Sequence, residues 1–63
     1  MVEIKIIKDD NLIKECYVQN CSVDYEEKKI EFFDVEYHRY YYESIDRGFH
    51  GSGMPYFNIT IKD

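Results

Sequence analysis

The sequence predicts an all-β fold, because its composition and its hydrophobic pattern both favour strands. Of its 63 residues, 24 are β-branched or aromatic (eight Ile, four Val, one Thr, seven Tyr and four Phe), while Ala and Trp are absent and Leu12 is the single leucine. The 24 belong to the residue types that are enriched in strands and mediocre in helices, which excludes an all-helical bundle. We expect one domain over residues 1–63: a small antiparallel meander of four to five strands, forming a curled sheet or a partial barrel of the SH3 or OB size class.

The first hairpin is predicted from alternation and turn chemistry. Apolar and polar side chains alternate over residues 2–8, as in a half-buried strand, and Ile7 breaks the alternation near its end. The run Asp9-Asp10-Asn11 then supplies residues that tolerate a left-handed backbone, so a tight turn leads into a second strand. Between residues 12 and 25 the apolar positions change parity, and Gln19-Asn20 is where we expect a bulge or a short turn.

The middle of the chain predicts a second hairpin followed by a bent segment. Residues 26–29 form a charged tip between two apolar runs, as expected for a hairpin loop. Residues 30–45 are too many for one straight strand, and their alternation slips at Phe32-Phe33, which predicts a bend or bulge there. Beyond the slip we expect Phe33, Val35 and Tyr37 to face inward and Asp34 and Glu36 to face outward.

The last third of the chain predicts a loop and a final strand. Residues 46–55 contain all three glycines and the single proline, so we expect a ten-residue loop. Residues 56–61 alternate as a strand, with Phe57, Ile59 and Ile61 inward. The pattern also allows one short helix in place of a strand, at 9–18 or at 36–45.

The net charge of −5 is concentrated in one part of the chain. Residues 24–46 carry eight acids and three bases, whereas the remaining residues carry five of each. An outward row of Glu31, Asp34 and Glu36 either keeps a small domain soluble and blunts its strands, or offers carboxylates to a basic protein surface. Lysines and arginines are few and scattered, so we do not expect direct binding to duplex nucleic acid.

The sequence contains no recognisable catalytic or metal-binding motif. Cys16, Cys21, His38 and His50 lack the short second ligand pair of a zinc site, and no serine or cysteine stands with histidine in a nucleophilic arrangement. We therefore expect neither an enzyme, nor a cofactor, nor a metal. No apolar run of about 20 residues predicts a membrane span, and the first residues lack the layout of a signal peptide, so we expect a cytoplasmic protein with reduced cysteines.

Two groups of residues are candidate binding sites. The first combines acids with residue types that are enriched at interface hot spots, since three consecutive tyrosines cannot all face one core. We expect it to bind protein through Glu31, Asp34, Glu36, Arg39, Tyr40, Tyr41, Tyr42 and Glu43. The second is the glycine-rich loop, whose backbone amides and side chains could hold an anion next to a stacked ring. Its candidate residues are Arg47, Phe49, His50 and Ser52.

In size, acidity and lack of a catalytic motif, the chain resembles the compact inhibitor proteins encoded by phages and mobile elements, including DNA mimics and anti-defence proteins. This resemblance of format implies a viral protein in the host cytosol that occludes a host nucleic-acid-processing enzyme with a basic surface. Two alternatives stay open: a homo-oligomeric sponge that binds a nucleotide or another small molecule through residues 46–55, and a structural or assembly subunit. A chain of this length buries only about 60% of its unfolded surface, so a homodimer or a higher oligomer is also an open alternative.

Overall fold

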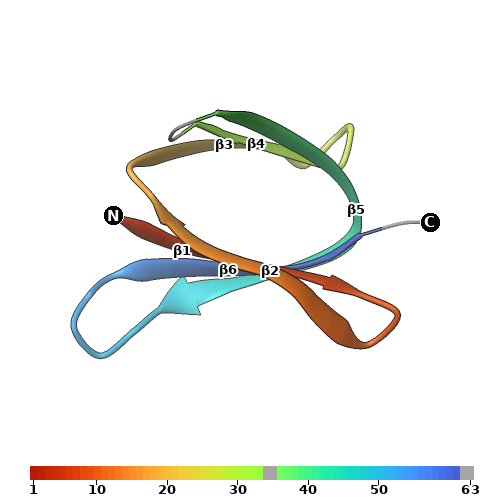
Figure 1. The fold of residues 1–63 in the computed structure, drawn as a ribbon. Helices are drawn as coiled ribbons and strands as arrows, with labels where there is room; N and C mark the ends of the chain where they lie inside the picture. Colours follow the sequence, from red (N-terminus) through yellow and green to blue (C-terminus); the bar gives the residue numbers. More distant parts are fainter. Residues whose placement is uncertain (34–35, 62–63) are drawn as a thin grey trace.

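The computed structural model describes residues 1–33 and 36–61, and this part of the chain forms six strands and no helix (Figure 1). The strands are β1 (Val2–Lys8), β2 (Asn11–Val18), β3 (Asn20–Asp24), β4 (Lys29–Phe33), β5 (Tyr37–Phe49) and β6 (Pro55–Ile61). They form one sheet in the order β2-β1-β6-β5-β4-β3. The all-β prediction is therefore confirmed, and the alternative of a short helix at 9–18 or 36–45 is wrong, because β2 and β5 occupy those segments.

The topology differs from the expected antiparallel meander of four to five strands. The sheet has six strands and is mixed, because β1 pairs with β6 in parallel, with Glu3 opposite Tyr56 and Ile7 opposite Thr60. The other neighbouring strands pair antiparallel. The sheet is open, with β2 and β3 at its two ends, so it is neither a closed barrel nor a strongly curled sheet.

The first hairpin forms as the sequence predicts. Asp9 and Asp10 have φ angles of 51° and 64°, so both central turn residues adopt the left-handed conformation that matches the twist of a two-residue hairpin. The Asn11 side chain donates to the Asp9 carbonyl at 3.0 Å. The strand register shifts between Ile6 and Ile7, where the alternation of the sequence breaks.

The second hairpin is closed by an aspartate. Asp24 Oδ1 accepts hydrogen bonds from the backbone N–H groups of Glu26 at 3.0 Å and Glu27 at 2.9 Å, and Lys28 takes a left-handed φ of 55°. This turn connects β3 to β4. The predicted change of parity is also present: Gln19 separates β2 from β3, so that Cys16, Cys21 and Val23 all pack against the buried core.

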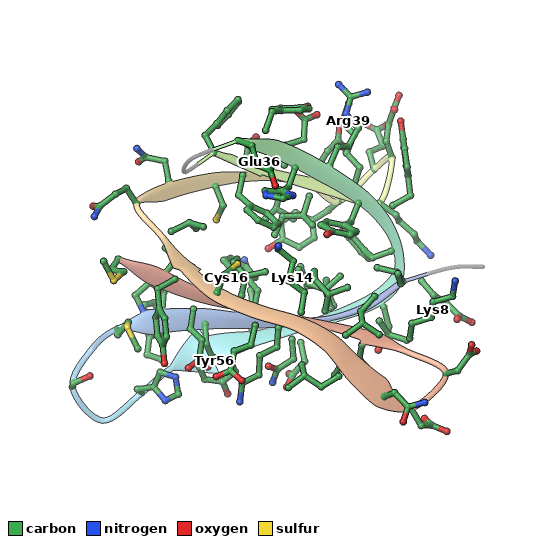
Figure 2. The ribbon with its side chains drawn as sticks, viewed as in Figure 1. Lys8, Lys14, Cys16, Glu36, Arg39 and Tyr56 are labelled. Atoms are coloured by element: carbon green, nitrogen blue, oxygen red, sulfur yellow. The ribbon has the colours of Figure 1, made fainter. Side chains whose placement is uncertain are left out.

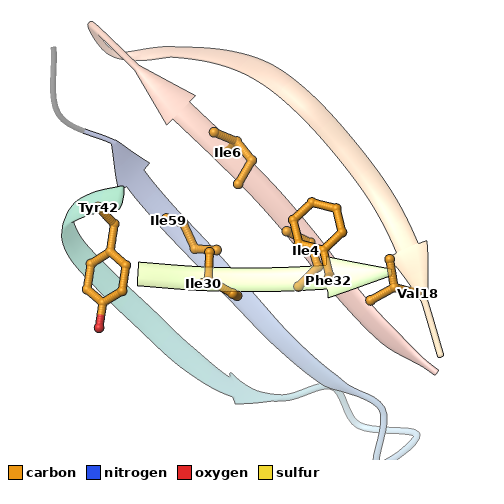
Figure 3. Packing of buried hydrophobic residues seen from close by; sticks show 7 residues of the cluster. All are labelled: Ile4, Ile6, Val18, Ile30, Phe32, Tyr42 and Ile59. Atoms are coloured by element: carbon orange, nitrogen blue, oxygen red, sulfur yellow. The ribbon is translucent and has the colours of Figure 1, made fainter. Parts of the chain in front are cut away.

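The core lies between two parts of the sheet that β5 connects. The first half of β5 pairs with β4 and the second half pairs with β6, and the register shifts between Tyr42 and Ser44. Figure 3 shows the result: β4 crosses over β1 and β6, so that side chains of both parts meet. The buried cluster consists of Ile4, Ile6, Val18, Ile30, Phe32, Tyr42 and Ile59.

The chain departs from the prediction after Phe32. Instead of a bulge, β4 ends at Phe33 and a new strand begins at Tyr37. Phe33 and Tyr37 were expected inward, but they pair with each other across β4 and β5 and are 55% and 45% exposed. The inward positions belong to the neighbouring pair, Phe32 and His38. Asp34 and Val35 lie outside the described residues.

The predicted loop over residues 46–55 is much shorter in the structure. β5 continues to Phe49 and β6 begins at Pro55, which leaves residues 50–54 as the connection. Within it, the backbone N–H of Gly53 donates to the His50 carbonyl at 2.8 Å. The final strand is as predicted, since Ile59 is fully buried and Phe57 and Ile61 pack against the core.

Candidate functional site

The outer side of β4 and β5 carries three opposed pairs of side chains. Residues that stand opposite each other in an antiparallel ladder point to the same side of the sheet. Because Ile30 and Phe32 face the core, the alternate residues of both strands face solvent. We call this surface the aromatic face; its pairs are Phe33–Tyr37, Glu31–Arg39 and Lys29–Tyr41.

Three rings of the aromatic face are exposed to solvent. The exposed fractions are 55% for Phe33, 45% for Tyr37 and 53% for Tyr41. The rings of Phe33 and Tyr37 contact each other, with centroids 5.0 Å apart and planes inclined by 49°. Tyr37 and Tyr41 lie four residues apart on one strand, a separation of about 13 Å. The rings therefore border a broad surface rather than a single point.

Arg39 lies between these rings in a fixed orientation. Its guanidinium carbon is 5.5 Å from the centroid of the Tyr37 ring, and its Nε donates to Tyr37 Oη at 3.0 Å. Figure 2 shows Arg39 pointing away from the core. A cation that is held by a ring and a hydroxyl loses less side-chain entropy when it contacts a partner.

Glu31 lies in the centre of the aromatic face and is paired with two cations. It accepts a hydrogen bond from Tyr37 Oη, and its Oε1 is 3.3 Å from Lys29 Nζ and 3.6 Å from Arg39 Nε. The hydrogen bond from Tyr37 is the main cause that lowers the pKa of Glu31; desolvation opposes it, and Lys29 and Arg39 assist it. Glu31 is therefore ionised, but its charge is balanced locally.

The predicted protein-binding residues are divided between the two sides of the sheet. Tyr41 lies on the aromatic face together with Glu31 and Arg39, and Glu36 and Glu43 are exposed near it in the chain. Tyr42, by contrast, is only 3% exposed, and Tyr40 is half-buried against the core, so both lie on the inner side rather than on the aromatic face. Asp34 lies outside the described residues. Sequence reasoning missed Phe33, Tyr37 and Lys29, which only the pairing of β4 with β5 identifies.

His38 belongs to the inner side of the sheet. Its ring is stacked on those of Phe32 and Tyr40, with centroid distances of 5.0 Å and 6.4 Å. Its Nε2 lies 3.3 Å from Glu36 Oε1. Cys16 and Cys21 are not joined by a disulfide, and burial raises the pKa of Cys21. In the described part of the chain, no three His, Cys, Asp or Glu side chains come together to hold a metal ion.

The structure does not bring the predicted ligand residues of the glycine-rich segment together. Arg47 and Phe49 line an open hollow of about 430 Å³ at the end of the β5–β6 hairpin. His50 instead reaches β1, where its Nε2 is 3.2 Å from Glu3 Oε1. Ser52 is exposed in the turn. Two backbone N–H groups of this turn already donate within it, from His50 to the Met54 carbonyl and from Gly53 to the His50 carbonyl.

Glu3 is a buried carboxylate that the sequence pattern places on the polar side of a strand. It is 6% exposed and accepts a hydrogen bond from Tyr17 Oη at 3.1 Å, and Lys5 Nζ lies 3.9 Å away. Burial alone would raise its pKa, but hydrogen bonds to His50 and Tyr17 and the charge of Lys5 outweigh it, so the pKa of Glu3 is lowered. Through His50, this carboxylate attaches the turn of residues 50–54 to β1.

The chain matches no protein-family model, no curated protein and no solved structure. Within residues 1–33 and 36–61, no helix is present that could cross a membrane.

Proposed function

We propose that this protein is a small inhibitor or modulator that binds a partner protein through the aromatic face. The observation that carries the proposal is the set of three exposed rings around a positioned arginine on adjacent strands. Tyrosine and arginine are among the residue types most enriched at interface hot spots. A rigid pair of strands presents them without an ordering cost, because the contacts of Arg39 with Tyr37 already exist in the free protein.

The proposed partner has a basic surface around its docking site. The carboxylates that are free to act on it are those that flank the aromatic face, because Glu31 is balanced by two cations. These flanking acids are exposed: Glu26, Glu27 and Glu43. Glu36 is exposed as well, but its Oε1 is 3.3 Å from Nε2 of His38, which faces the inner side. Together with the net charge of −5, the flanking acids favour encounter with a cationic surface and raise the association rate at low salt.

A host nucleic-acid-processing enzyme is the class of partner that fits this combination best. Such enzymes carry a basic groove for the phosphate backbone, and a protein that occupies the groove excludes the nucleic acid. This assigns the protein the role of a DNA mimic or an anti-defence protein of a phage or mobile element. Duplex DNA should then compete with the protein for its partner.

The test is an affinity capture followed by measurement with the purified partner. The immobilised protein is exposed to host lysate at low salt, the retained enzyme is identified and purified, and its dissociation constant is measured by calorimetry. Tyr41→Ser should weaken binding at least tenfold, as expected for a hot-spot ring. Ile13→Ser is the matched control: Ile13 is 53% exposed on β2, away from the aromatic face, and should change binding less than twofold.

A second pair of variants tests the role of charge. Glu27→Lys combined with Glu43→Lys should lower the association rate and weaken its dependence on salt, while the dissociation rate changes little. If no enzyme is retained at low salt, or if Tyr41→Ser binds as tightly as the unchanged protein, the aromatic face is not a binding surface. If duplex DNA does not compete, the partner is not occluded at its nucleic-acid groove.

A further inference from the structure

The open hollow at the end of the β5–β6 hairpin lies apart from the aromatic face. Its walls come from three cross-strand pairs, Arg47–Phe57, Gly48–Tyr56 and Phe49–Pro55. Its volume of about 430 Å³ lies within the range of small-molecule sites. None of the residues that line it belongs to the aromatic face, so the hollow and the aromatic face can be occupied independently.

One end of the hollow is apolar. Phe49 is 75% exposed, more than any other large apolar side chain in the described part of the chain, and it stands opposite Pro55. Phe57 is partly buried against the core and so forms a fixed wall. A ring that enters the hollow would cover apolar surface that water now contacts, and burial of apolar surface favours binding.

Gly48 and Tyr56 lie on the reverse side of the sheet from the Arg47–Phe57 and Phe49–Pro55 pairs, because successive side chains of a strand alternate between its two sides. A Cβ at this position would lie 2.6 Å from Tyr56 Oη and 2.8 Å from Tyr56 Cζ, so the Tyr56 ring lies directly against the β5 backbone. His50 holds the same ring from the other side, with centroids 5.0 Å apart. The Tyr56 ring is therefore held against the back of the two strands that form the hollow and supports their backbone there.

The other end of the hollow carries a cation without an acidic partner. Arg47 Nη1 donates to Tyr25 Oη at 2.7 Å, and its guanidinium carbon is 5.2 Å from the centroid of the Tyr25 ring. No carboxylate of residues 1–33 or 36–61 lies within 4.0 Å of it, in contrast to Arg39, which is paired with Glu31. A guanidinium has five N–H donors, so Arg47 can bind an anion without giving up Tyr25.

We propose that this hollow binds a small molecule in which a planar aromatic ring carries an anionic group, either a carboxylate or a phosphate. The ring lies against Phe49 and Phe57, and the anion accepts two parallel hydrogen bonds from Arg47, the geometry in which guanidinium binds oxyanions. Both parts of the ligand are required. A neutral ring makes no ion pair with Arg47, and an inorganic anion leaves the apolar surface of Phe49 and Phe57 exposed to water.

The experiment is a chemical-shift titration of the ¹⁵N-labelled protein with four small probes and one nucleotide. Phenyl phosphate and benzoate contain the ring and the anion, whereas phenol and inorganic phosphate contain one part each. We expect saturable shifts of the Gly48 and Phe57 amides with at least one of the two complete probes, at concentrations at least tenfold lower than with either part. Binding of adenosine monophosphate would indicate that the natural ligand carries a phosphate, and binding of benzoate would indicate a carboxylate.

Variants distinguish this site from unspecific binding. Arg47→Gln and Phe49→Ser should each weaken the complete probe at least tenfold, and Phe49 is exposed enough that its replacement leaves the fold intact. Arg39→Gln is the matched control, since it removes a positive charge from the aromatic face and should not change binding. The proposal is overturned if no complete probe shifts these amides at millimolar concentration, if phenol or phosphate binds as well, or if Arg47→Gln binds normally.

Discussion

The packing of β4 across β1 and β6 can be tested by removing one methylene group from the centre of the core. Ile30 on β4 and Ile59 on β6 are both fully buried and belong to the same cluster. Ile30→Val removes a methylene worth about 0.8 kcal/mol in transfer free energy, and with the small cavity left behind the cost is about 1 kcal/mol. Ile59→Val should cost about the same, because its surroundings are equally closed.

The assay is urea and thermal unfolding, followed by circular dichroism. A loss of about 1 kcal/mol lowers Tm by about 4–8 °C in a domain of this size, with an unchanged denaturant slope. Ile13→Val is the matched control, since Ile13 is 53% exposed on β2 and its change should stay within about 0.5 kcal/mol. If Ile30→Val is as neutral as Ile13→Val while Ile59→Val carries its full cost, then β4 does not pack over β1 and β6.

Three further predictions concern a turn, a buried acid and the aromatic face. Gly53→Ala should destabilise the protein by about 1–2 kcal/mol, because Gly53 has a φ of +91°, whereas Gly51→Ala should be nearly neutral, because no atom lies within 4 Å of its added Cβ. Glu3 has a lowered pKa, so its contribution to stability is fully present above pH 4.5 and is lost as the pH falls below 4.5 and through the lower pKa of the folded state; Glu3→Gln should flatten the dependence of the unfolding free energy on pH between pH 7 and pH 3. Tyr37→Phe should raise the pKa of Glu31 towards its ordinary value of 4.5, as measured by a carboxyl NMR titration.

Each of these predictions has an outcome that contradicts it. Equal stability of the two glycine variants would mean that the backbone of the turn is not left-handed at Gly53. A Glu3→Gln protein that loses stability in acid as steeply as the unchanged protein would show that other carboxylates control acid unfolding. An unchanged titration of Glu31 in the Tyr37→Phe variant would show that the hydroxyl of Tyr37 does not bond to the carboxylate.

The local parts of the fold could be predicted because they depend on neighbouring residues. Alternation over β1 identifies Ile4 and Ile6 as buried, and the Asp9-Asp10 pair identifies the turn, since both signals act within a few positions of the chain. The break at Ile7 and the change of parity at Gln19 were visible for the same reason.

The pairing of distant strands could not be predicted in this way. A strand that alternates as β6 does can be buried equally well beside β5 alone or between β5 and β1, and the pattern does not indicate whether its neighbour is parallel. The ring positions after Phe32 were wrong because β4 and β5 form a hairpin there instead of one bulged strand. The inward parity of Ile30 and Phe32 continues on β5 at Tyr40 and Tyr42, so Phe33 and Tyr37, which have the opposite parity, face outward.

The candidate sites show the same division between local and distant information. The residue types of the aromatic face were visible in the sequence, and the exposure of one of the three consecutive tyrosines, Tyr41, is confirmed. The pairing of Glu31 with Arg39, and the separation of His50 from Arg47, depend on which strand lies opposite which. The acidic row of the sequence is therefore partly neutralised in three dimensions.

The position of β6 between β1 and β5 has a consequence for how the chain acquires its structure. A chain that stops before residue 55 can form the β1–β2 hairpin and the β3–β4–β5 meander, but no strand then connects these two units. Each unit would expose one half of the core, with Ile4 and Ile6 on one and Ile30 and Phe32 on the other. During synthesis we therefore expect the chain to be aggregation-prone and sensitive to proteases until β6 has left the ribosome. The free energy of folding is then gained in one late step, when β6 pairs with β1 and β5.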